Sequence, residues 1–283
     1  MNYVNGHDLK QIVTSALKED IGRQDITTQT LVSSKKYVNA VLLAKQDLVI
    51  CGLGVAGLVF RTLDKNIKFR PKFHDGDLVK RNSGIARISG KASSILTAER
   101  VALNFLTLLS GIATETRDFV NAIKPYKARI LDTRKTIPGL RILEKYAVRT
   151  GGGFNHRLAL DEMIMVKDNH LKALGGYQGL RALKGKKYQV ELEVANLKEF
   201  RQALDLKPDI IMLDNMNVLD MKQAVKIRNG RSTKPQQQAP KLEASGNINL
   251  KNIKQVASSG VDMISIGALT HSLNSVDISL EIL

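Results

Sequence analysis

Four positively charged side chains lie close to apolar runs in the middle of the chain. Arg134 and Lys135 stand in LDTRKTIPGLR, Arg157 stands in GGGFNHR and Lys167 stands in MIMVKDN. Like charges repel one another, and the repulsion grows where water is excluded. Four cations gathered at neighbouring strand ends would be unfavourable in an empty pocket. The sequence therefore predicts a site for a polyanion.

Two carboxylates and several small residues continue the pattern. Glu193 stands in VELEV and Asp214 ends DIIMLD. Carboxylates beside phosphate-binding cations commonly hold Mg²⁺ or accept hydrogen bonds from sugar hydroxyls. Ser245 and Gly246 in EASGN, and Gly267 in SIGALTHS, can offer backbone N–H groups to a phosphate near a helix start. These residues predict acids and a phosphate-binding turn beside the cations.

A histidine belongs to the same group of candidates. His156 precedes Arg157 and follows the three glycines 151–153, which allow the backbone to approach a ligand closely. A single histidine is more often a packed core residue, and a single Arg or Lys is more often solvated surface. The functional interpretation therefore depends on whether the fold brings these residues together.

Six short apolar runs are expected to position the candidate residues. They are ARILDT, MIMVKDN, YQVELEV, DIIMLDN, KLEAS and MISIGAL. The intervals between them leave room for helices, so the strands are predicted to run parallel. In a doubly wound sheet, the characteristic ligand-binding residues would lie in the first glycine-rich turn. Polar residues at the ends of many strands therefore favour an α/β barrel.

The first part of the chain shows a different pattern of apolar residues and turns. Residues 7–19 and 95–123 show the apolar spacing of helices, the second with a bend expected at Gly111. Residues 37–92 alternate short apolar runs with turns, which indicates strands. CGLGVAG (51–57) matches G-x-G-x-x-G, but no regular βαβ unit surrounds it, so a tight strand-to-helix turn is favoured over a dinucleotide site.

Length and composition limit the class of protein. A chain of 283 residues forms two domains or one large one. Cys51 is the single cysteine, which excludes an internal disulfide and favours a packing role in a reducing, cytoplasmic compartment. The opening residues lack the continuous apolar region of a signal peptide, and uncharged stretches such as 101–114 are short for a membrane helix.

The net charge of +16 allows three kinds of partner: a nucleic acid, an anionic membrane surface or strongly anionic small substrates. Tryptophan is absent and aromatic residues are scarce, whereas proteins that bind single strands stack bases on aromatic side chains. The cations also stand at strand ends. Anionic substrates are favoured, with no nucleic acid or membrane partner, and a basic nucleic-acid-binding protein with salt-sensitive binding is the alternative.

The motifs together resemble the nicotinate-nucleotide pyrophosphorylase (carboxylating) family, also called quinolinate phosphoribosyltransferases. Besides the blocks already quoted, the resemblance includes EDIGRQDITT, LTAERVALNFLTLLSGIAT, YAVRTGGGFNHR, KDNH and GVDMISIGALTHS, and it covers nearly the whole chain in order. A relative of the same fold that acts on another anion, such as a molybdenum-transport-associated protein, is a further alternative. The sequence has all the residues expected to bind quinolinate, which favours the quinolinate phosphoribosyltransferase family. They are Arg100, Arg134, Lys135, His156 and Arg157.

The resemblance implies a fold, a reaction and an assembly. The fold would be an N-terminal α+β open sandwich domain (1–112), an incomplete parallel α/β barrel (113–270) and a C-terminal segment (271–283) that returns to the N-terminal domain. The reaction would convert quinolinate and phosphoribosyl pyrophosphate, with Mg²⁺, into nicotinate mononucleotide, pyrophosphate and CO₂ for NAD biosynthesis. The enzyme would be a cytoplasmic homodimer.

The resemblance also implies roles for individual residues. Arg100 in LTAER would reach quinolinate in the neighbouring subunit's site. The other substrate-binding residues would be Arg134, His156, Arg157 and Lys167, with Ser245, Gly246, Gly267 and His271 in the phosphate-binding region. Lys135, Glu193 and Asp214 would be catalytic, and Glu193 and Asp214 would also hold the metal. No covalent nucleophile is expected.

Two further features of the sequence bear on these expectations. Asn247 stands where the family usually has a second glycine after EASG. Because Asn tolerates left-handed backbone angles, the turn is expected to survive, and the substitution is expected to affect the affinity for the sugar phosphate. Residues 221–242 carry six Lys or Arg and no acid, and we interpret them as a solvated loop rather than a binding tail.

Overall fold

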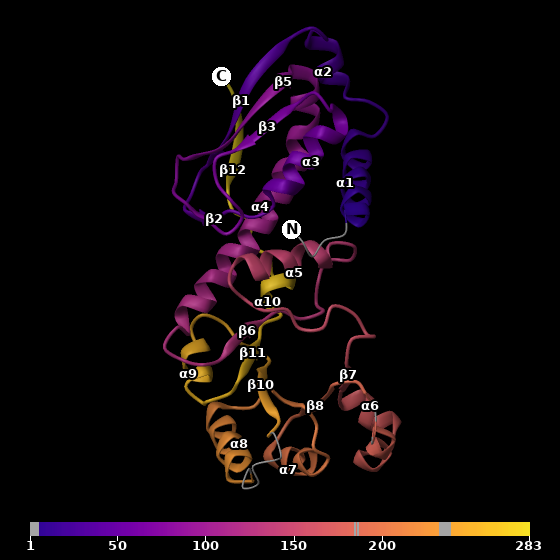
Figure 1. The fold of residues 1–283 in the computed structure, drawn as a ribbon, viewed down its shortest axis with the longest axis vertical. Helices are drawn as coiled ribbons and strands as arrows, with labels where there is room; N and C mark the ends of the chain where they lie inside the picture. The colour runs from indigo at the N-terminus through magenta and orange to yellow at the C-terminus, as the bar shows by residue number, and fades with distance from the viewer. Residues whose placement is uncertain (1–5, 184, 186, 232–238) are drawn as a thin grey trace. The chain divides into compact units, whose positions relative to one another are not determined.

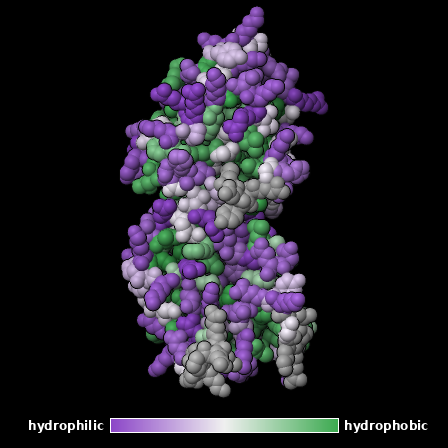
Figure 2. Space-filling view, in the orientation of Figure 1, coloured by the Kyte–Doolittle hydropathy of each residue, from purple (hydrophilic) through white to green (hydrophobic). Residues whose placement is uncertain are grey.

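The computed structural model describes residues 6–183, 185, 187–231 and 239–283. The chain forms two compact units (Figure 1). Unit 1 comprises Met1–Arg117, Thr136–Gly152 and Leu269–Leu283, and unit 2 comprises Asp118–Lys135 and Gly153–Ala268. Figure 2 shows that hydrophilic side chains cover much of the visible face of both units, with apolar side chains in small groups between them.

Unit 1 is built on an antiparallel sheet in the order β12-β1-β5-β3. Its strands are β1 (Tyr37–Ala44), β3 (Lys68–Pro71), β5 (Gly84–Lys91) and β12 (Ile278–Ile282), and a separate pair joins β2 (Leu48–Val49) to β4 (Leu78–Val79). Alternate side chains of β1 are buried, as expected for a sheet with one face on the core. The C-terminal strand β12 lies against β1, near the other end of the sequence (Figure 1).

Helices cover this sheet and complete unit 1. They are α1 (Gly6–Ile21), α2 (Ile26–Leu31), α3 (Leu53–Leu63), most of α4 (Ala92–Ala122) and α5 (Arg141–Thr150). The buried face of α1 is the stripe Leu9, Val13 and Leu17, with the spacing of successive helical turns. Gly52 precedes α3 with φ of 99°, so the glycine-rich motif forms the predicted strand-to-helix turn.

The long helix α4 runs without interruption through Gly111, where the sequence predicted a bend. The glycine serves close packing, because a Cβ atom at this position would lie 2.1 Å from the carbonyl oxygen of Asn274. By length and composition α4 is also apolar enough to cross a membrane. Because 61% of its apolar window is buried inside the protein, it has the character of a core helix.

Unit 2 contains a six-stranded parallel sheet in the order β6-β11-β10-β9-β8-β7. The strands are β6 (Arg129–Leu131), β7 (Ile164–Val166), β8 (Val190–Val194), β9 (Ile210–Asp214), β10 (Lys241–Ser245) and β11 (Met263–Ser265). Each of the six predicted runs forms one strand, and β6 and β7, consecutive in sequence, occupy opposite edges. The predicted fold class, an N-terminal α+β open sandwich domain followed by an incomplete parallel α/β barrel, is confirmed.

Helical segments connect the parallel strands. They are α6 (Asp168–Ala173), the 3₁₀ helix η1 (Tyr177–Leu183), α7 (Leu197–Asp205), α8 (Val218–Arg231) and α9 (Ile253–Ala257). The short helix α10 (Ala268–His271) follows the last parallel strand and lies mostly in unit 1. The prediction of a loop at 221–242 is wrong for residues 221–231, which continue α8, bury Met221 and Ala224, and pair Arg228 with Asp262. Residues 232–238 lie outside the described part of the chain.

The two units divide the sequence differently from the predicted boundaries at 112 and 270. Residues 136–152, which include α5, pack within unit 1 although they follow the first parallel strand. The hydroxyl of Tyr146 donates a 2.7 Å hydrogen bond to Asp75, and Nε of Arg117 donates one of 2.8 Å to the carbonyl of Gly151. These contacts hold α5 against the rest of unit 1.

Candidate active site

The polar residues predicted to form the site gather at the C-terminal ends of the parallel strands. Asp214 ends β9 and stands in register with Ser245, which ends β10, while Lys167 follows β7 directly. Parallel strands present these ends at the same edge of the sheet. Unit 2 holds Arg134, Lys135, His156, Arg157, Lys167, Glu193, Asp214, Ser245, Gly246 and Gly267. We call the C-terminal ends of these parallel strands, with the loops that follow them, the rim; His156 lies beneath it.

One predicted cation and one predicted carboxylate pair across neighbouring strands of the rim. Nζ of Lys167 contacts Oε2 of Glu193, and the two side chains are 43% and 13% exposed. Asp214, at the end of the adjacent strand β9, accepts a 3.0 Å hydrogen bond from the side-chain amide of Asn215. Oxygen donors of this kind suit Mg²⁺, which takes one or two carboxylates and completes its shell with water and phosphate. Glu193 and Asp214 therefore fit the metal expected here.

Two predicted cations lie close to each other in a partly buried place. Burial lowers the pKa of Arg157, and the nearby positive charge of Arg134 lowers it further. The guanidinium of Arg157 donates a 3.0 Å hydrogen bond to the carbonyl of Met163, while its Nε is buried without a hydrogen-bond partner. A bound anion would offset the repulsion between the two arginines.

The segment that carries Arg157 is attached to the first parallel strand by a buried aspartate. Asp132 accepts a 2.9 Å hydrogen bond from the backbone N–H of His156, and its other oxygen accepts one from the side chain of Asn155. The backbone N–H of Phe154 donates a 2.8 Å bond to Ile130. These bonds explain why Arg157, distant in sequence, lies near Arg134.

At least one of the glycines that precede this segment is needed for packing and not for contact with a ligand. A Cβ atom on Gly151 would lie 2.5 Å from the carbonyl oxygen of Ala113 and 2.6 Å from Cβ of Thr116. Gly151 thus allows the backbone to approach α4. The expectation that the glycines allow a ligand to approach is not needed to explain this residue.

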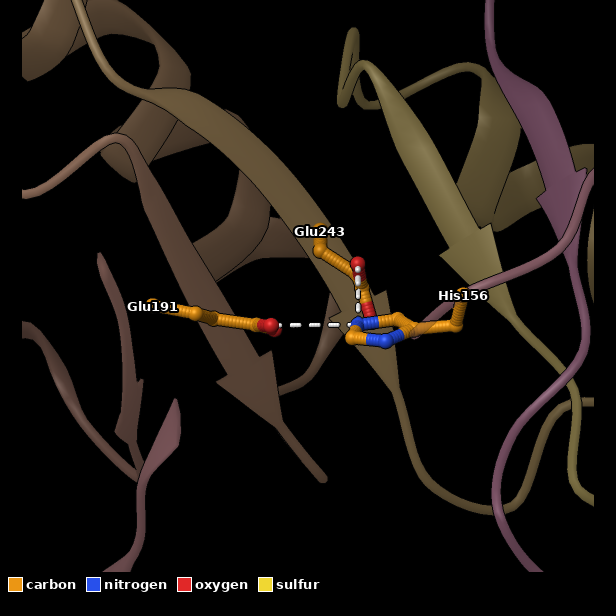
Figure 3. A group of neighbouring side chains, drawn as sticks. All are labelled: His156, Glu191 and Glu243. Carbon is orange, nitrogen blue, oxygen red and sulfur yellow. Dashed lines mark ion pairs between the residues drawn. The ribbon is translucent and has the colours of Figure 1, made fainter. Parts of the chain in front are cut away.

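His156 points beneath the rim toward two carboxylates (Figure 3). Its Nε2 lies 3.1 Å from Oε2 of Glu191 and 3.5 Å from Oε2 of Glu243, and both carboxylate side chains are fully buried. Burial by itself lowers the pKa of His156, but the two glutamates outweigh it and raise the pKa. Burial also raises the pKa of Glu191. The carboxylates therefore favour a proton on Nε2, the ring nitrogen that faces them.

Glu191 and Glu243 were not among the residues predicted for the site. Side chains two residues apart in a strand point to the same side, so Glu191 lies on the side of Glu193, and Glu243 on the side of Ser245. An acid two positions before a rim residue was the signal that could have identified them. Among the described residues, His156, Glu191 and Glu243 are also the group whose ligand atoms lie close enough together for a metal ion.

The turn that the sequence predicts to bind phosphate adopts the expected left-handed backbone. Gly246 has φ of 95° and Asn247 has φ of 52°, so the Asn in the glycine's place takes the left-handed conformation. The side chain of Asn247 donates a 2.9 Å hydrogen bond to Asn215, and a Cβ on Gly246 would lie 2.2 Å from the same oxygen. Asn215, which the sequence analysis missed, therefore organises the turn.

Two predicted residues belong to unit 1. Arg100 is exposed on α4, and His271 is exposed at the end of α10, with Nδ1 2.8 Å from the hydroxyl of Ser272.

Cys51 is also in unit 1, and its side chain is fully buried. Burial raises the pKa of the Cys51 thiol, so the reactive thiolate is disfavoured. This environment agrees with the packing role predicted for Cys51.

Known proteins resemble this chain over nearly its whole length. Residues 25–110 match the family described as "Quinolinate phosphoribosyl transferase, N-terminal domain", and residues 112–281 match the corresponding C-terminal domain. A Synechocystis protein named "Probable nicotinate-nucleotide pyrophosphorylase [carboxylating]" is 44% identical, covering 94% of this chain and 90% of its own length. The chloroplastic nicotinate-nucleotide pyrophosphorylase [carboxylating] of Arabidopsis thaliana is 40% identical, covering 98% and 83%.

Solved structures give the same result. The nicotinate-nucleotide pyrophosphorylase from Francisella tularensis superposes with a TM-score of 0.92 at 40% identity, covering 100% of this chain and 98% of its own. The enzyme of the same name from Ehrlichia chaffeensis superposes with a TM-score of 0.91 at 36% identity, covering 99% of each chain.

Proposed function

The chain belongs to the quinolinate phosphoribosyltransferase family, and we propose that the rim of unit 2 is where it carries out the family's reaction. The enzyme is a carboxylating nicotinate-nucleotide pyrophosphorylase, a pentosyltransferase of NAD biosynthesis. It converts quinolinate and phosphoribosyl pyrophosphate into nicotinate mononucleotide, pyrophosphate and CO₂. The single observation that supports the rim most strongly is that the hydrogen bonds of Asp132 join the two segments that carry the partly buried arginines Arg134 and Arg157.

Quinolinate suits this pair because it carries two carboxylates on a flat ring. A guanidinium can donate two parallel hydrogen bonds to a carboxylate, so two arginines fix both the position and the orientation of the ring. Lys167 beside Glu193 adds a point charge, which needs less exact geometry. In this proposal Arg134, Arg157 and Lys167 bind quinolinate and hold its nitrogen toward the second substrate.

The second substrate brings a phosphate monoester and a pyrophosphate, each terminal phosphate with roughly −1.5 to −2 charges at neutral pH. Backbone N–H groups near Ser245, Gly246 and Gly267 are suited to the monoester, with His271 as a further phosphate ligand. Lys135 would face the pyrophosphate. Glu193 and Asp214 would hold Mg²⁺, which neutralises pyrophosphate charge when bound.

The carboxylates of the rim also suit the transition state. The quinolinate nitrogen attacks the anomeric carbon while pyrophosphate leaves, and positive charge develops on the ribose. Glu193 and Asp214 stabilise that charge because they are preorganised at the ends of adjacent strands. When CO₂ is lost, the alkylated nitrogen stabilises the carbanion that remains on the ring carbon, and this carbon then takes up a proton from water to give nicotinate mononucleotide. The protein therefore needs mainly to orient the ring and limit its solvation.

Assembly and location extend the proposal. Arg100 is exposed on α4, within the LTAER motif through which the chain resembles its family, and it would reach quinolinate in the other subunit of a homodimer. The free buried thiol of Cys51 fits a reducing compartment, which supports a cytoplasmic location.

Turnover with defined substrates tests the reaction. Purified protein supplied with quinolinate, phosphoribosyl pyrophosphate and Mg²⁺ is expected to release CO₂ and pyrophosphate in equal amounts, and a chelator is expected to stop both. Nicotinate replacing quinolinate serves as the control substrate. Equal turnover of nicotinate would contradict the proposed substrate.

Subunit mixing tests the placement of Arg100. Arg100→Ala and Asp214→Ala are each expected to be inactive, but a mixed dimer contains one intact site. Random exchange should therefore restore about one quarter of the parental activity. Exchange is verified with differently tagged chains, and an inactive mixture of verified mixed dimers would contradict a shared site.

A further inference from the structure

Three side chains beneath the rim form a cluster that the proposed reaction does not use directly. We call His156, Glu191 and Glu243 the buried triad. The glutamates come from β8 and β10, and the histidine comes from the segment that Asp132 attaches to β6 (Figure 3). The triad therefore joins three parts of unit 2 immediately below the predicted substrate ligands.

Protein groups engage the polar atoms of His156 on every side. Nε2 faces Glu191 at 3.1 Å and Glu243 at 3.5 Å. When the ring carries its proton on Nε2, Nδ1 accepts a 2.8 Å hydrogen bond from the backbone N–H of Arg157, and the backbone N–H of His156 itself donates to Asp132. The side chain is only 6% exposed. The ring is therefore poorly placed to bind a substrate and well placed to fix the backbone next to it.

We infer that the buried triad positions Arg157 for quinolinate. The two carboxylates hold the imidazole ring, the ring holds the backbone N–H of Arg157, and the guanidinium is thereby kept beside Arg134. Glu191 and Glu243 are positioning residues in this arrangement, and His156 acts through Arg157 instead of as a substrate ligand. The inference rests on the proposed function of the rim.

A divalent metal ion is the competing occupant, because one imidazole and two carboxylates also form a metal-binding set. The contacts favour the positioning role. Nε2 already lies at ion-pair distance from both acids, and the other oxygen of Glu243 accepts a 2.6 Å hydrogen bond from Ser265. The acids are thus arranged around the ring nitrogen and a hydroxyl group.

Kinetics of conservative variants test the inference. Glu191→Gln and Glu243→Gln keep an acceptor oxygen but remove the charge, and each is expected to raise the KM for quinolinate about tenfold, the usual scale for loss of an orienting partner. The KM for phosphoribosyl pyrophosphate should change by less than about twofold. Glu199→Gln, the same change on α7 of the same unit, is the matched control. An unchanged quinolinate KM in both triad variants would overturn the inference.

A double-mutant cycle separates positioning from direct contact. If Glu191 acts through the ring, Glu191→Gln should add nothing to the quinolinate KM in a His156→Gln background. Full additivity of the two changes would overturn the inference. Calorimetric titration with quinolinate gives the same comparison without turnover, so a parental protein that binds quinolinate but forms no product would contradict the proposed function alone.

A milder variant covers the case in which the glutamine variants do not fold. Ser265→Ala removes the donor to Glu243 and is expected to raise the quinolinate KM in the same direction by a smaller factor. No change in this variant would count against the triad. Elemental analysis of the purified protein closes the test: a stoichiometric divalent metal that survives dialysis and is lost in Glu191→Gln would identify a metal site and overturn the positioning role.

Discussion

The two sheets of this enzyme treat buried charge in opposite ways. Within the described strands of the antiparallel sheet in unit 1, the buried positions are apolar, as at Leu42 of β1 and Ile88 of β5. The parallel sheet of unit 2 buries two carboxylates, Glu191 and Glu243, completely. Burying a carboxylate costs free energy unless the group is paired. The difference therefore indicates that the parallel sheet, and not the antiparallel sheet, holds buried polar groups for a functional reason.

The largest expected effect lies at the rim of the parallel sheet. Arg134→Ala removes one of two adjacent cations, and we expect kcat/KM for quinolinate to fall roughly 10²- to 10³-fold, the scale of losing one preorganised charge at a reacting centre. Steady-state kinetics measures the loss, and circular dichroism checks the fold. A reduction of less than about threefold would remove Arg134 from the site.

A change in unit 1 provides the contrast to that prediction. Cys51 is fully buried, so Cys51→Ala should cost about 1 kcal/mol of the free energy of unfolding. Its kcat/KM should remain close to the parental value. A stability loss without a kinetic loss would sharpen the comparison, whereas a large kinetic loss would show that unit 1 contributes to chemistry through more than Arg100.

An intermediate effect is expected at a buried acid in unit 1 that belongs to a helix. Glu144 of α5 is fully buried, and burial raises its pKa to about 7 from an ordinary value of 4.5. A raised carboxyl pKa means that folding favours the protonated form, so the parent loses stability as pH rises from about 4.5 to 7. Glu144→Gln cannot ionise and keeps an acceptor for the backbone N–H of Ile137.

Thermal unfolding at several pH values checks this prediction. The Tm of Glu144→Gln minus that of the parent should increase between pH 5 and pH 7 and level off above. Glu19→Gln, at an exposed position of α1, is the control for general charge effects. A constant difference across the range would show that Glu144 is ionised in the folded protein without penalty.

The smallest effect is expected at the phosphate-binding turn. Asn247 already adopts the left-handed conformation, with φ of 52°, so Asn247→Gly relieves little strain and loses one hydrogen bond to Asn215. We expect the KM for phosphoribosyl pyrophosphate to change by less than about threefold. A change of tenfold or more would mean that the amide itself contacts the sugar phosphate.

Much of unit 2 could be predicted from the sequence because its signals are local. Each parallel strand is an apolar run that ends in a polar residue, so the runs ending near Asp214 and Ser245 revealed both the strands and the rim. The acids Glu191 and Glu243 were overlooked because a carboxylate inside an apolar run gives no local sign of its partner. The imidazole between them comes from residue 156, and only the folded chain brings the three together.

Unit 1 was harder to predict because its contacts are distant in sequence. The packing of α5 against the rest of unit 1 includes the hydrogen bond between Tyr146 and Asp75. No periodicity in the sequence indicates this contact, because the two residues are far apart along the chain. Gly111 illustrates the same limit. A glycine in a helical pattern predicted a bend, but its reason is the carbonyl of Asn274, which approaches the helix from a remote segment.

The pairing of β12 with β1 has a consequence for how the protein is made. A nascent chain that stops before residue 278 leaves β1 with an open edge, because Ala40–Ala44 pair with Ile278–Ile282. The first sheet to leave the ribosome is therefore complete only after residues 278–282 have been translated. Until they emerge, that edge is available to other chains, and we expect chaperone demand during synthesis to depend on unit 1.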